Sequence, residues 1–189
     1  LAMLVDEGKL DWDDRVRDHL PWFELYDAYV SDQFTIRDLL THRSGLRTFS
    51  GDLLWYGTDL DREEVVRSAR FLEPSFGFRG GYGYSNIMYL AAGLIIEEVS
   101  GMSWDDFIRT RILEPLHMDR TVSSTRALQG MDNVSAPHND YGDSIITINW
   151  LNWDNIAPAG GLISSANDMT KWLAFQINKG ITADGDTLL

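Results

Sequence analysis

The chain has 189 residues, a formal net charge of -13 at pH 7, no cysteine and 44% hydrophobic residues. A surface this acidic repels phosphate backbones, so we expect no nucleic-acid partner. The absence of cysteine excludes disulfides, thiolate metal sites and a cysteine nucleophile. The apolar content is enough for one good core, and no apolar run is long enough to form a transmembrane segment.

Short helices are predicted at the start of the chain. The stretch LAMLVDEGKL is typical of the last turns of a helix that ends at Gly8. Residues 11–34 are charged, aromatic and irregular. A short helix then begins at Thr35 and is closed by Gly45.

A capping pattern and a long apolar stripe predict the next two helices. Asp61 and Glu64 have the spacing of a capping box, which predicts a helix over about 62–72. Ser85 is predicted to cap the following helix, which ends at Gly101. Its apolar residues recur every three or four positions, and further apolar residues widen this stripe around the helix. We therefore expect the helix to be deeply buried.

The rest of the chain is predicted to hold two more helices and little strand. Ser103 caps a helix that stops before Pro115. Residues 121–160 are mostly loop, with β-leaning pieces near NVSAPH and SIITIN, and Ser165 begins a last amphipathic helix that ends at Gly180. The pattern is mainly α with a few short strands. It lacks the strand–helix–strand alternation of Rossmann-like folds and TIM barrels, and no linker divides residues 1–189.

The stretch GGYGYSN, residues 80–86, is the first candidate for chemistry. Tyr84 precedes the predicted helix and Asn86 lies in its first turn, so both side chains can face one cleft. A phenol acts as a base near neutrality only if nearby cations favour the phenolate or a relay removes its proton. The structural alternative is a capped helix with a packed tyrosine, and the triplet alone does not separate the two.

The residues 153–165, WDNIAPAGGLISS, form the second candidate segment. A Pro-Ala-Gly-Gly loop before a helix cap exposes backbone N–H groups. It either lines a pocket, with Asn155, Ala159 and Gly160 contacting a substrate, or is a tight loop that leads into the helix.

Other motifs favour structural roles. The glycines before Tyr84 lack the Lys of a phosphate-binding loop. His42 and Ser44 are two residues apart at a helix end and do not face each other. The four histidines lack the spacing of a zinc site, so we expect no metal. A triad of Ser44, His138 and Asp140 is a remaining, weaker alternative.

The order of several blocks resembles the penicillin-recognising serine hydrolases. The blocks are LLTHRSGL, GDLLW, GYSN at a helix start, ILEPLHM and APAGGLISSANDMTKWL. They are most similar to the class C β-lactamase-like branch, with D-alanyl-D-alanine carboxypeptidases and related esterases. The resemblance implies the helical part of an α+β fold of the β-lactamase/transpeptidase type, with most of the antiparallel sheet outside the chain and one apolar face left exposed.

The resemblance also implies roles for two residues. The family combines Ser-x-x-Lys, Tyr-x-Asn and a Lys-Thr-Gly-like triad, and Tyr84 and Asn86 match the second element. Tyr84 would relay the proton from the serine to the leaving group. Asn86 would hold the lysine of the first element and the amide carbonyl of the substrate.

Departures from the family pattern set the limits of this prediction. The chain has no Ser-x-x-Lys and no Lys-Thr-Gly or His-Thr-Gly, which we expect upstream of Leu1 and downstream of the last helix. His117 stands where relatives carry glycine, which is tolerated but less favourable if the backbone there is left-handed. We therefore interpret residues 1–189 as a partial domain that is inactive alone.

The expected function is that of a serine hydrolase acting through a covalent acyl-serine on a β-lactam, a D-amino peptide or an ester. No metal or organic cofactor is implied. The resemblance favours a periplasmic or extracellular location and leaves the oligomeric state open. The alternative is a non-catalytic binding or scaffold homologue without the nucleophile.

Overall fold

The computed structural model describes residues 1–188 and is mainly helical. Its one sheet in that range has two antiparallel strands. The mainly α prediction is therefore confirmed. The elements are α1 (Ala2–Asp6), α2 (Val16–His19), α3 (Ala28–Gln33), α4 (Ile36–Thr41), α5 (Arg62–Ser68), α6 (Asn86–Ser100), α7 (Trp104–Ile108), α8 (Ala157–Gly160), α9 (Ala166–Ile177), β1 (His138–Asp140) and β2 (Ile145–Thr147).

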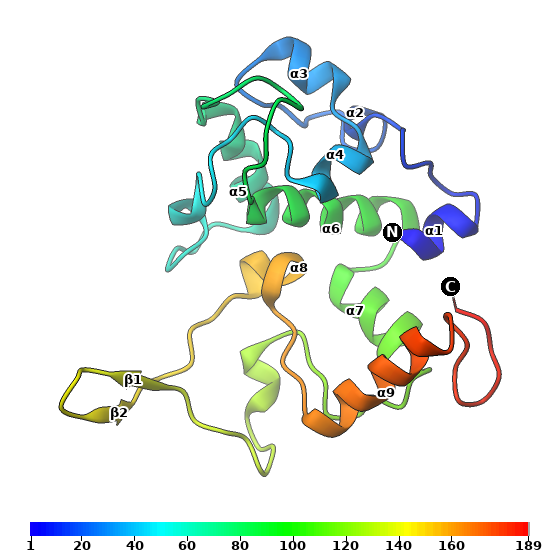
Figure 1. The fold of residues 1–189 in the computed structure, drawn as a ribbon, viewed down its shortest axis with the longest axis vertical. Helices are drawn as coiled ribbons and strands as arrows, with labels where there is room; N and C mark the ends of the chain where they lie inside the picture. Colours follow the sequence, from blue (N-terminus) through cyan, green and yellow to red (C-terminus); the bar gives the residue numbers. More distant parts are fainter. Residues whose placement is uncertain (189) are drawn as a thin grey trace.

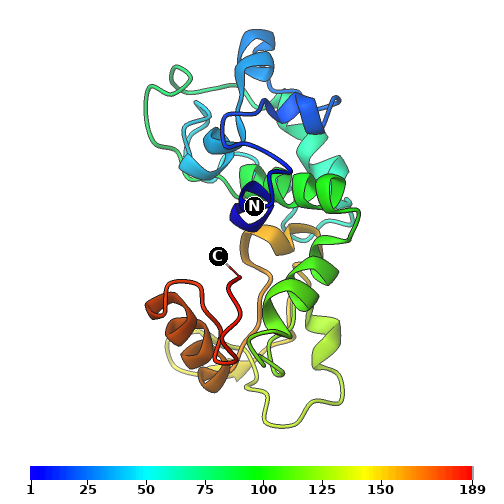
Figure 2. The same ribbon diagram turned by 90° about the vertical axis from the view of Figure 1, so that its right-hand side faces the viewer.

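Helix α6 organises the molecule, as its apolar stripe predicts. Ile87, Leu90 and Ile95 are fully buried, and α6 packs against α1, α2, α4, α5, α7 and α8. Each such side chain contributes about 1.5–3 kcal/mol on burial. In Figures 1 and 2, α1–α6 form one part of the molecule, α7, α9 and the hairpin form the other, and α8 lies against α6 between them. The helix ends at Gly101, whose φ of 70° is the left-handed cap that the sequence predicts.

Local capping patterns set several helix starts. Asp61 accepts from the backbone N–H of Glu64 while the Glu64 carboxylate accepts from that of Asp61, so the predicted capping box is confirmed. The side chains of Ser103 and Ser165 cap α7 and α9. These interactions lie within four residues of sequence, which explains why pattern alone predicts them.

The structure corrects three details of the N-terminal half. The segment 11–34 is not wholly irregular, because it contains α2 and α3, each six residues or shorter. Helix α4 lies within the predicted stretch TIRDLLTH, but its C-terminal cap is His42, with φ 56°, rather than Gly45. Ser85 occupies the cap position of α6, but its hydroxyl makes no capping hydrogen bond.

The C-terminal part has its own small core and two exposed apolar features. Leu113, Leu116, Met118 and Phe175 form that core. The β1–β2 hairpin projects from the body in Figure 1, and its strand residues are all exposed. On α9, a stripe of apolar side chains spaced by four is exposed: Met169, Leu173 and Ile177.

None of the helices within residues 1–188 combines the length and hydrophobicity needed to cross a bilayer.

Candidate active site

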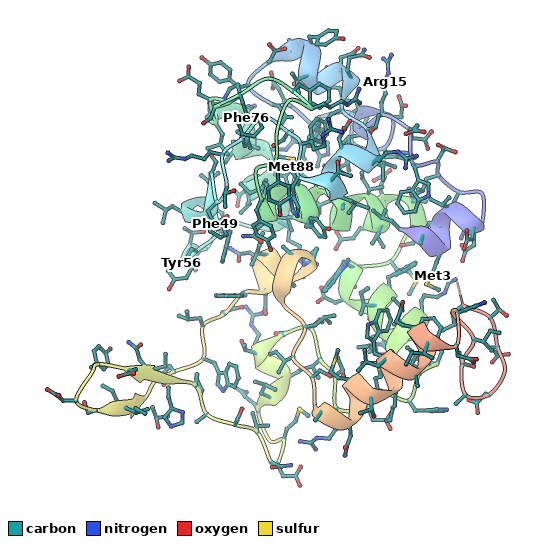
Figure 3. All side chains as sticks on the ribbon, in the orientation of Figure 1. Met3, Arg15, Phe49, Tyr56, Phe76 and Met88 are labelled. Carbon is teal, nitrogen blue, oxygen red and sulfur yellow. The ribbon has the colours of Figure 1, made fainter. Side chains whose placement is uncertain are left out.

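A pocket of about 350 Å³ lies at the N-terminal end of α6 and brings three distant segments together. Tyr84 and Asn86 line it with Ala159 and Gly160, so four of the five predicted site residues share one cavity. Figure 3 shows Phe49, another lining residue, beside the start of α6. The remaining lining residues are Asp52, Trp55, Trp153 and Ile156.

The backbone of Tyr84 is fixed by the segment that follows α4. Its N–H donates to Thr48 Oγ1 at 3.2 Å, and its carbonyl accepts from the Phe49 N–H at 2.9 Å. A Cβ at Gly83 would lie 1.8 Å from the Leu46 carbonyl oxygen, so this approach requires glycine. The half-buried phenol ring packs edge-on against Phe49, with the ring centroids 5.6 Å apart.

Asn86 is held by a carboxylate that the sequence analysis missed. Asn86 Nδ2 donates to Asp52 Oδ1 at 3.2 Å and to Asp52 Oδ2 at 3.1 Å. Asp52 Oδ1 also accepts from Trp55 Nε1 at 3.1 Å. In the sequence, Asp52 is only part of the block GDLLW that carries the family resemblance. No local pattern predicts its contact with Asn86, which is 34 residues away.

The segment 153–160 forms another wall of the pocket through Trp153, Ile156, Ala159 and Gly160. Trp153 meets Trp55 edge-on, with the ring centroids 5.6 Å apart. A Cβ at Gly93 would lie 2.4 Å from Pro158 Cγ, so the absence of a side chain there lets α8 pack closely on α6. Ala159 and Gly160 of α8 thus line the same pocket as Asn86.

Asn155 does not line this pocket but a neighbouring cavity of about 420 Å³, so its predicted contact with a substrate stays a prediction. Its Nδ2 donates to the carbonyl oxygens of Trp55 at 3.1 Å and Leu60 at 3.2 Å. The amide donors are therefore used to hold the loop that carries Trp55 against the 153–160 wall.

Arg62 secures the same wall from the other side. Its guanidinium donates to the Asp154 carbonyl oxygen at 3.0 Å, to Glu97 at 3.1 Å and to Asp105 at 2.8 Å. Since Glu97 belongs to α6 and Asp105 to α7, one side chain joins both helices to the pocket wall. The Arg62 side chain is 18% exposed, so water screens these contacts less than it screens surface pairs.

His42 connects the end of α4 to the start of α6 beside Tyr84. Its ring stacks on Tyr89, with the ring centroids 5.1 Å apart, and lies 4.6 Å from the Tyr84 ring. His42 Nδ1 accepts from the Ser85 backbone N–H at 3.1 Å, so the ring is neutral with its proton on Nε2. Burial lowers the pKa of His42 below its ordinary value of 6.5, in agreement with that state.

The alternative triad and the metal site receive no geometric support. Ser44 is buried, and its Oγ accepts from the Leu46 N–H at 3.2 Å. His138 lies in the hairpin, where its nitrogens contact the Ala136 carbonyl and the Thr147 hydroxyl. Among residues 1–188, no three histidine or carboxylate side chains gather as metal ligands. His117 has φ 53°, so the left-handed backbone considered from the sequence is present.

Comparison with known proteins establishes the family. The family model described as Beta-lactamase matches residues 1–189, and the chain belongs to that family. The predicted resemblance is thus confirmed.

Two curated relatives illustrate the similarity. An unguisins hydrolase of Aspergillus campestris is 30% identical over 184 residues, covering 91% of this chain and 34% of that protein. Penicillin-binding protein 4 of Amycolatopsis lactamdurans is 28% identical over 203 residues, covering 100% of this chain and 50% of that protein. The chain therefore spans about a third to a half of the length of these relatives.

Two solved structures share the fold. The octameric penicillin-binding protein homologue from Pyrococcus abyssi matches with a TM-score of 0.79 and 28% identity, covering 94% of this chain and 41% of that one. A D-amino acid amidase from Ochrobactrum anthropi SV3 matches with a TM-score of 0.76 and 27% identity, covering 93% of this chain and 50% of that one. The chain thus shares the helical part of a fold found in hydrolases.

Proposed function

We propose that residues 1–189 are a partial domain that supplies the Tyr-x-Asn element of a serine hydrolase. The intact protein would hydrolyse an amide or ester through a covalent acyl-serine. One observation carries the proposal: Tyr84 and Asn86 line one pocket with Ala159 and Gly160, which belong to a segment far away in the sequence. The Ser-x-x-Lys and Lys-Thr-Gly-like elements, which the chain lacks, would complete the site.

The proposed reaction has two halves. The serine Oγ attacks the carbonyl carbon, and its proton passes through the lysine and Tyr84 to the leaving nitrogen or oxygen as the C–N or C–O bond breaks. Water then attacks the acyl-serine ester and gives one proton to the same relay. The acid leaves and the serine hydroxyl is restored, so the relay returns to its starting state.

The pocket residues divide this work. The Tyr84 hydroxyl transfers the proton, and an ammonium beside a phenol favours the phenolate that this step needs. Asn86 orients the lysine. Trp55, Phe49 and Trp153 line the pocket with apolar rings and would contact the acyl part of the substrate.

The names of the relatives support an amide or ester substrate. They include a D-amino acid amidase and a penicillin-binding protein, while the unguisins hydrolase belongs to the same hydrolytic class by name. D-amino amides, β-lactams and simple esters are the substrates to compare.

The test is made on the intact protein with a fluorophosphonate and a labelled penicillin. Removal of the phenolic hydroxyl in Tyr84→Phe is expected to lower the acylation rate about 100-fold or more, the usual contribution of a general acid–base group. Tyr82→Phe is the matched control, since Tyr82 is exposed and does not line the pocket. Sustained hydrolysis by residues 1–189 alone, or full acylation of Tyr84→Phe, would contradict the proposal. An alanine or glycine at the serine position of the complete protein would instead indicate the binding homologue.

A further inference from the structure

We propose that Asp52 is a positioning residue that makes Asn86 a hydrogen-bond acceptor toward the pocket. This inference rests on the proposed function and concerns the same site. It concerns how Asn86 is held and leaves its predicted contact with the carbonyl of the substrate unchanged. The amide nitrogen of Asn86 faces both carboxylate oxygens of Asp52, at 3.2 and 3.1 Å.

The orientation of the Asn86 amide follows from the chemistry of its partner. An ionised carboxylate only accepts hydrogen bonds, so Asp52 can face the NH₂ side of the amide but repels the carbonyl side. A carboxylate acceptor also makes a stronger hydrogen bond than a neutral one. Asn86 Oδ1 is therefore directed away from Asp52, and among residues 1–188 no side chain donates to it.

The surroundings of Asp52 fix the carboxylate itself. Trp55 is buried and donates its Nε1–H to Asp52 Oδ1 at 3.1 Å. Asp52 starts a short 3-10 helix, Asp52–Leu54, directly after Gly51, whose φ is 84°. None of the residues lining the pocket is Lys or Arg, so within the described chain no cation in the pocket competes with Asn86 for this carboxylate.

The arrangement suits a cation that enters the pocket. Asn86 Oδ1 would accept from the ammonium of the Ser-x-x-Lys lysine, and the Asp52 charge behind it would strengthen that contact. Both Asp52 oxygens lie on the same side of the Asn86 nitrogen, so the contact fixes the orientation of the amide without using both of its N–H donors. We therefore infer that Asp52 fixes the orientation in which Asn86 Oδ1 acts on the lysine.

Exchanging the two side chains tests this inference in the intact protein. Asn86→Asp places two carboxylates about 3 Å apart, a like-charge contact that disfavours ionisation of both. It is expected to lower the acylation rate about 100-fold and the melting temperature by about 5 °C. In the double variant Asp52→Asn/Asn86→Asp, the amide at position 52 donates to the carboxylate at position 86. That carboxylate also presents an acceptor toward the pocket. We expect the double variant to recover the melting temperature and to be acylated at least about tenfold faster than Asn86→Asp.

The matched control is Asp59→Asn/Asn86→Asp. Asp59 lies in the same loop region, is exposed and does not line the pocket. Its replacement removes the same charge but gives the new carboxylate at position 86 no donor. This double variant is expected to recover neither quantity.

Each outcome bears on one proposal. Recovery of stability without any recovery of acylation would overturn the acceptor role, because the exchanged carboxylate at position 86 would then accept from the lysine without effect. Equal recovery by the Asp59 control would overturn the Asp52 assignment. If neither the parent protein nor any variant is acylated while the exchange restores stability, the proposed function fails and the Asp52–Asn86 pairing stands.

Discussion

His42 Nδ1 accepts a hydrogen bond from the backbone N–H of Ser85, at 3.1 Å, and so joins the end of one helix to the beginning of another. His42 caps α4 in the left-handed conformation, and Ser85 lies between Tyr84 and Asn86. The carbonyl of His42 also accepts from the Gly83 N–H at 2.9 Å. One residue thus fixes the backbone on both sides of Tyr84.

Protonation of His42 is expected to weaken this connection. Burial lowers the pKa of His42 below 6.5, so the folded protein binds fewer protons than the unfolded chain between the folded pKa and about 6.5. The His42 contribution to the free energy of unfolding is therefore complete above about pH 6.5 and falls as the pH drops toward the folded pKa. Urea unfolding at a series of pH values measures it.

The variants His42→Asn and His42→Leu separate the hydrogen bond from the ring. Asparagine tolerates a positive φ and keeps an acceptor near the position of Nδ1, but it does not titrate. We expect His42→Asn to lose the pH dependence while costing less stability than His42→Leu, which leaves the Ser85 N–H without its acceptor. A pH dependence that persists unchanged in His42→Asn would assign it to another group.

Acid should also weaken the link between Asp38 and Arg79. Burial alone would raise the pKa of Asp38, but hydrogen bonds from Arg79 and from the Thr35 N–H and hydroxyl outweigh it and lower that pKa below 3.8. The contribution to stability is therefore present above about pH 4 and is lost as the pH falls through the folded pKa. Arg79→Lys removes the two-pronged contact, at 2.9 and 2.6 Å, and should shift this loss to higher pH in acid-unfolding measurements.

Removing the Arg62 side chain should destabilise the protein more than removing a surface arginine. Arg62→Ala breaks contacts to α6, α7 and the 153–156 segment, and we expect a loss of about 1–3 kcal/mol in the free energy of unfolding. The Asp105 side chain is 38% exposed, so we expect the loss of stability to be smaller than for a fully buried ion pair. Arg37→Ala is the control: its pair with Asp13 is exposed and should contribute much less. Equal losses by denaturant titration would contradict the joining role of Arg62.

Gly93→Ala should be unfavourable although alanine is the better helix former. In an exposed helix the change gains about 1 kcal/mol, but here the new Cβ would lie 2.4 Å from Pro158 Cγ. Forcing α8 away from α6 is expected to cost about 1–3 kcal/mol and to move Ala159 and Gly160. Gly77→Ala, where no atom lies within 4 Å of the added Cβ, should change stability by less than about 0.5 kcal/mol. A stabilised Gly93→Ala in thermal unfolding would show that the contact relaxes freely.

Ser85→Ala tests whether the residue at the cap position of α6 acts as a cap. Its buried Oγ has no hydrogen-bond partner within the described residues, so its removal should be neutral or stabilising by up to about 1 kcal/mol. Thr35→Ala is the comparison, since Thr35 caps α4 through the Asp38 N–H and should cost about 1 kcal/mol. A similar cost for both variants would mean that the Ser85 hydroxyl finds a partner in solution.

Local patterns predicted much of the helical framework. The α6 stripe, the Asp61–Glu64 capping box and the Gly101 cap all depend on residues within a few positions of one another, so their physical causes are visible in the sequence. The same holds for the position of Tyr84 and Asn86 at the entrance of α6. The helices α2 and α3 were missed because they are too short to show a periodicity.

The pocket itself depended on contacts between distant segments. Asp52 meets Asn86 across 34 residues, and Asn155 meets the Trp55 carbonyl across 100. No local rule says which carboxylate will reach an amide, or whether an asparagine faces a cavity or the backbone. The sequence alone determined the longer helices and the residue types available for catalysis, through spacing and capping. Only the tertiary structure decided which of those residues meet, because that depends on how α8 and the 46–60 loop pack against α6.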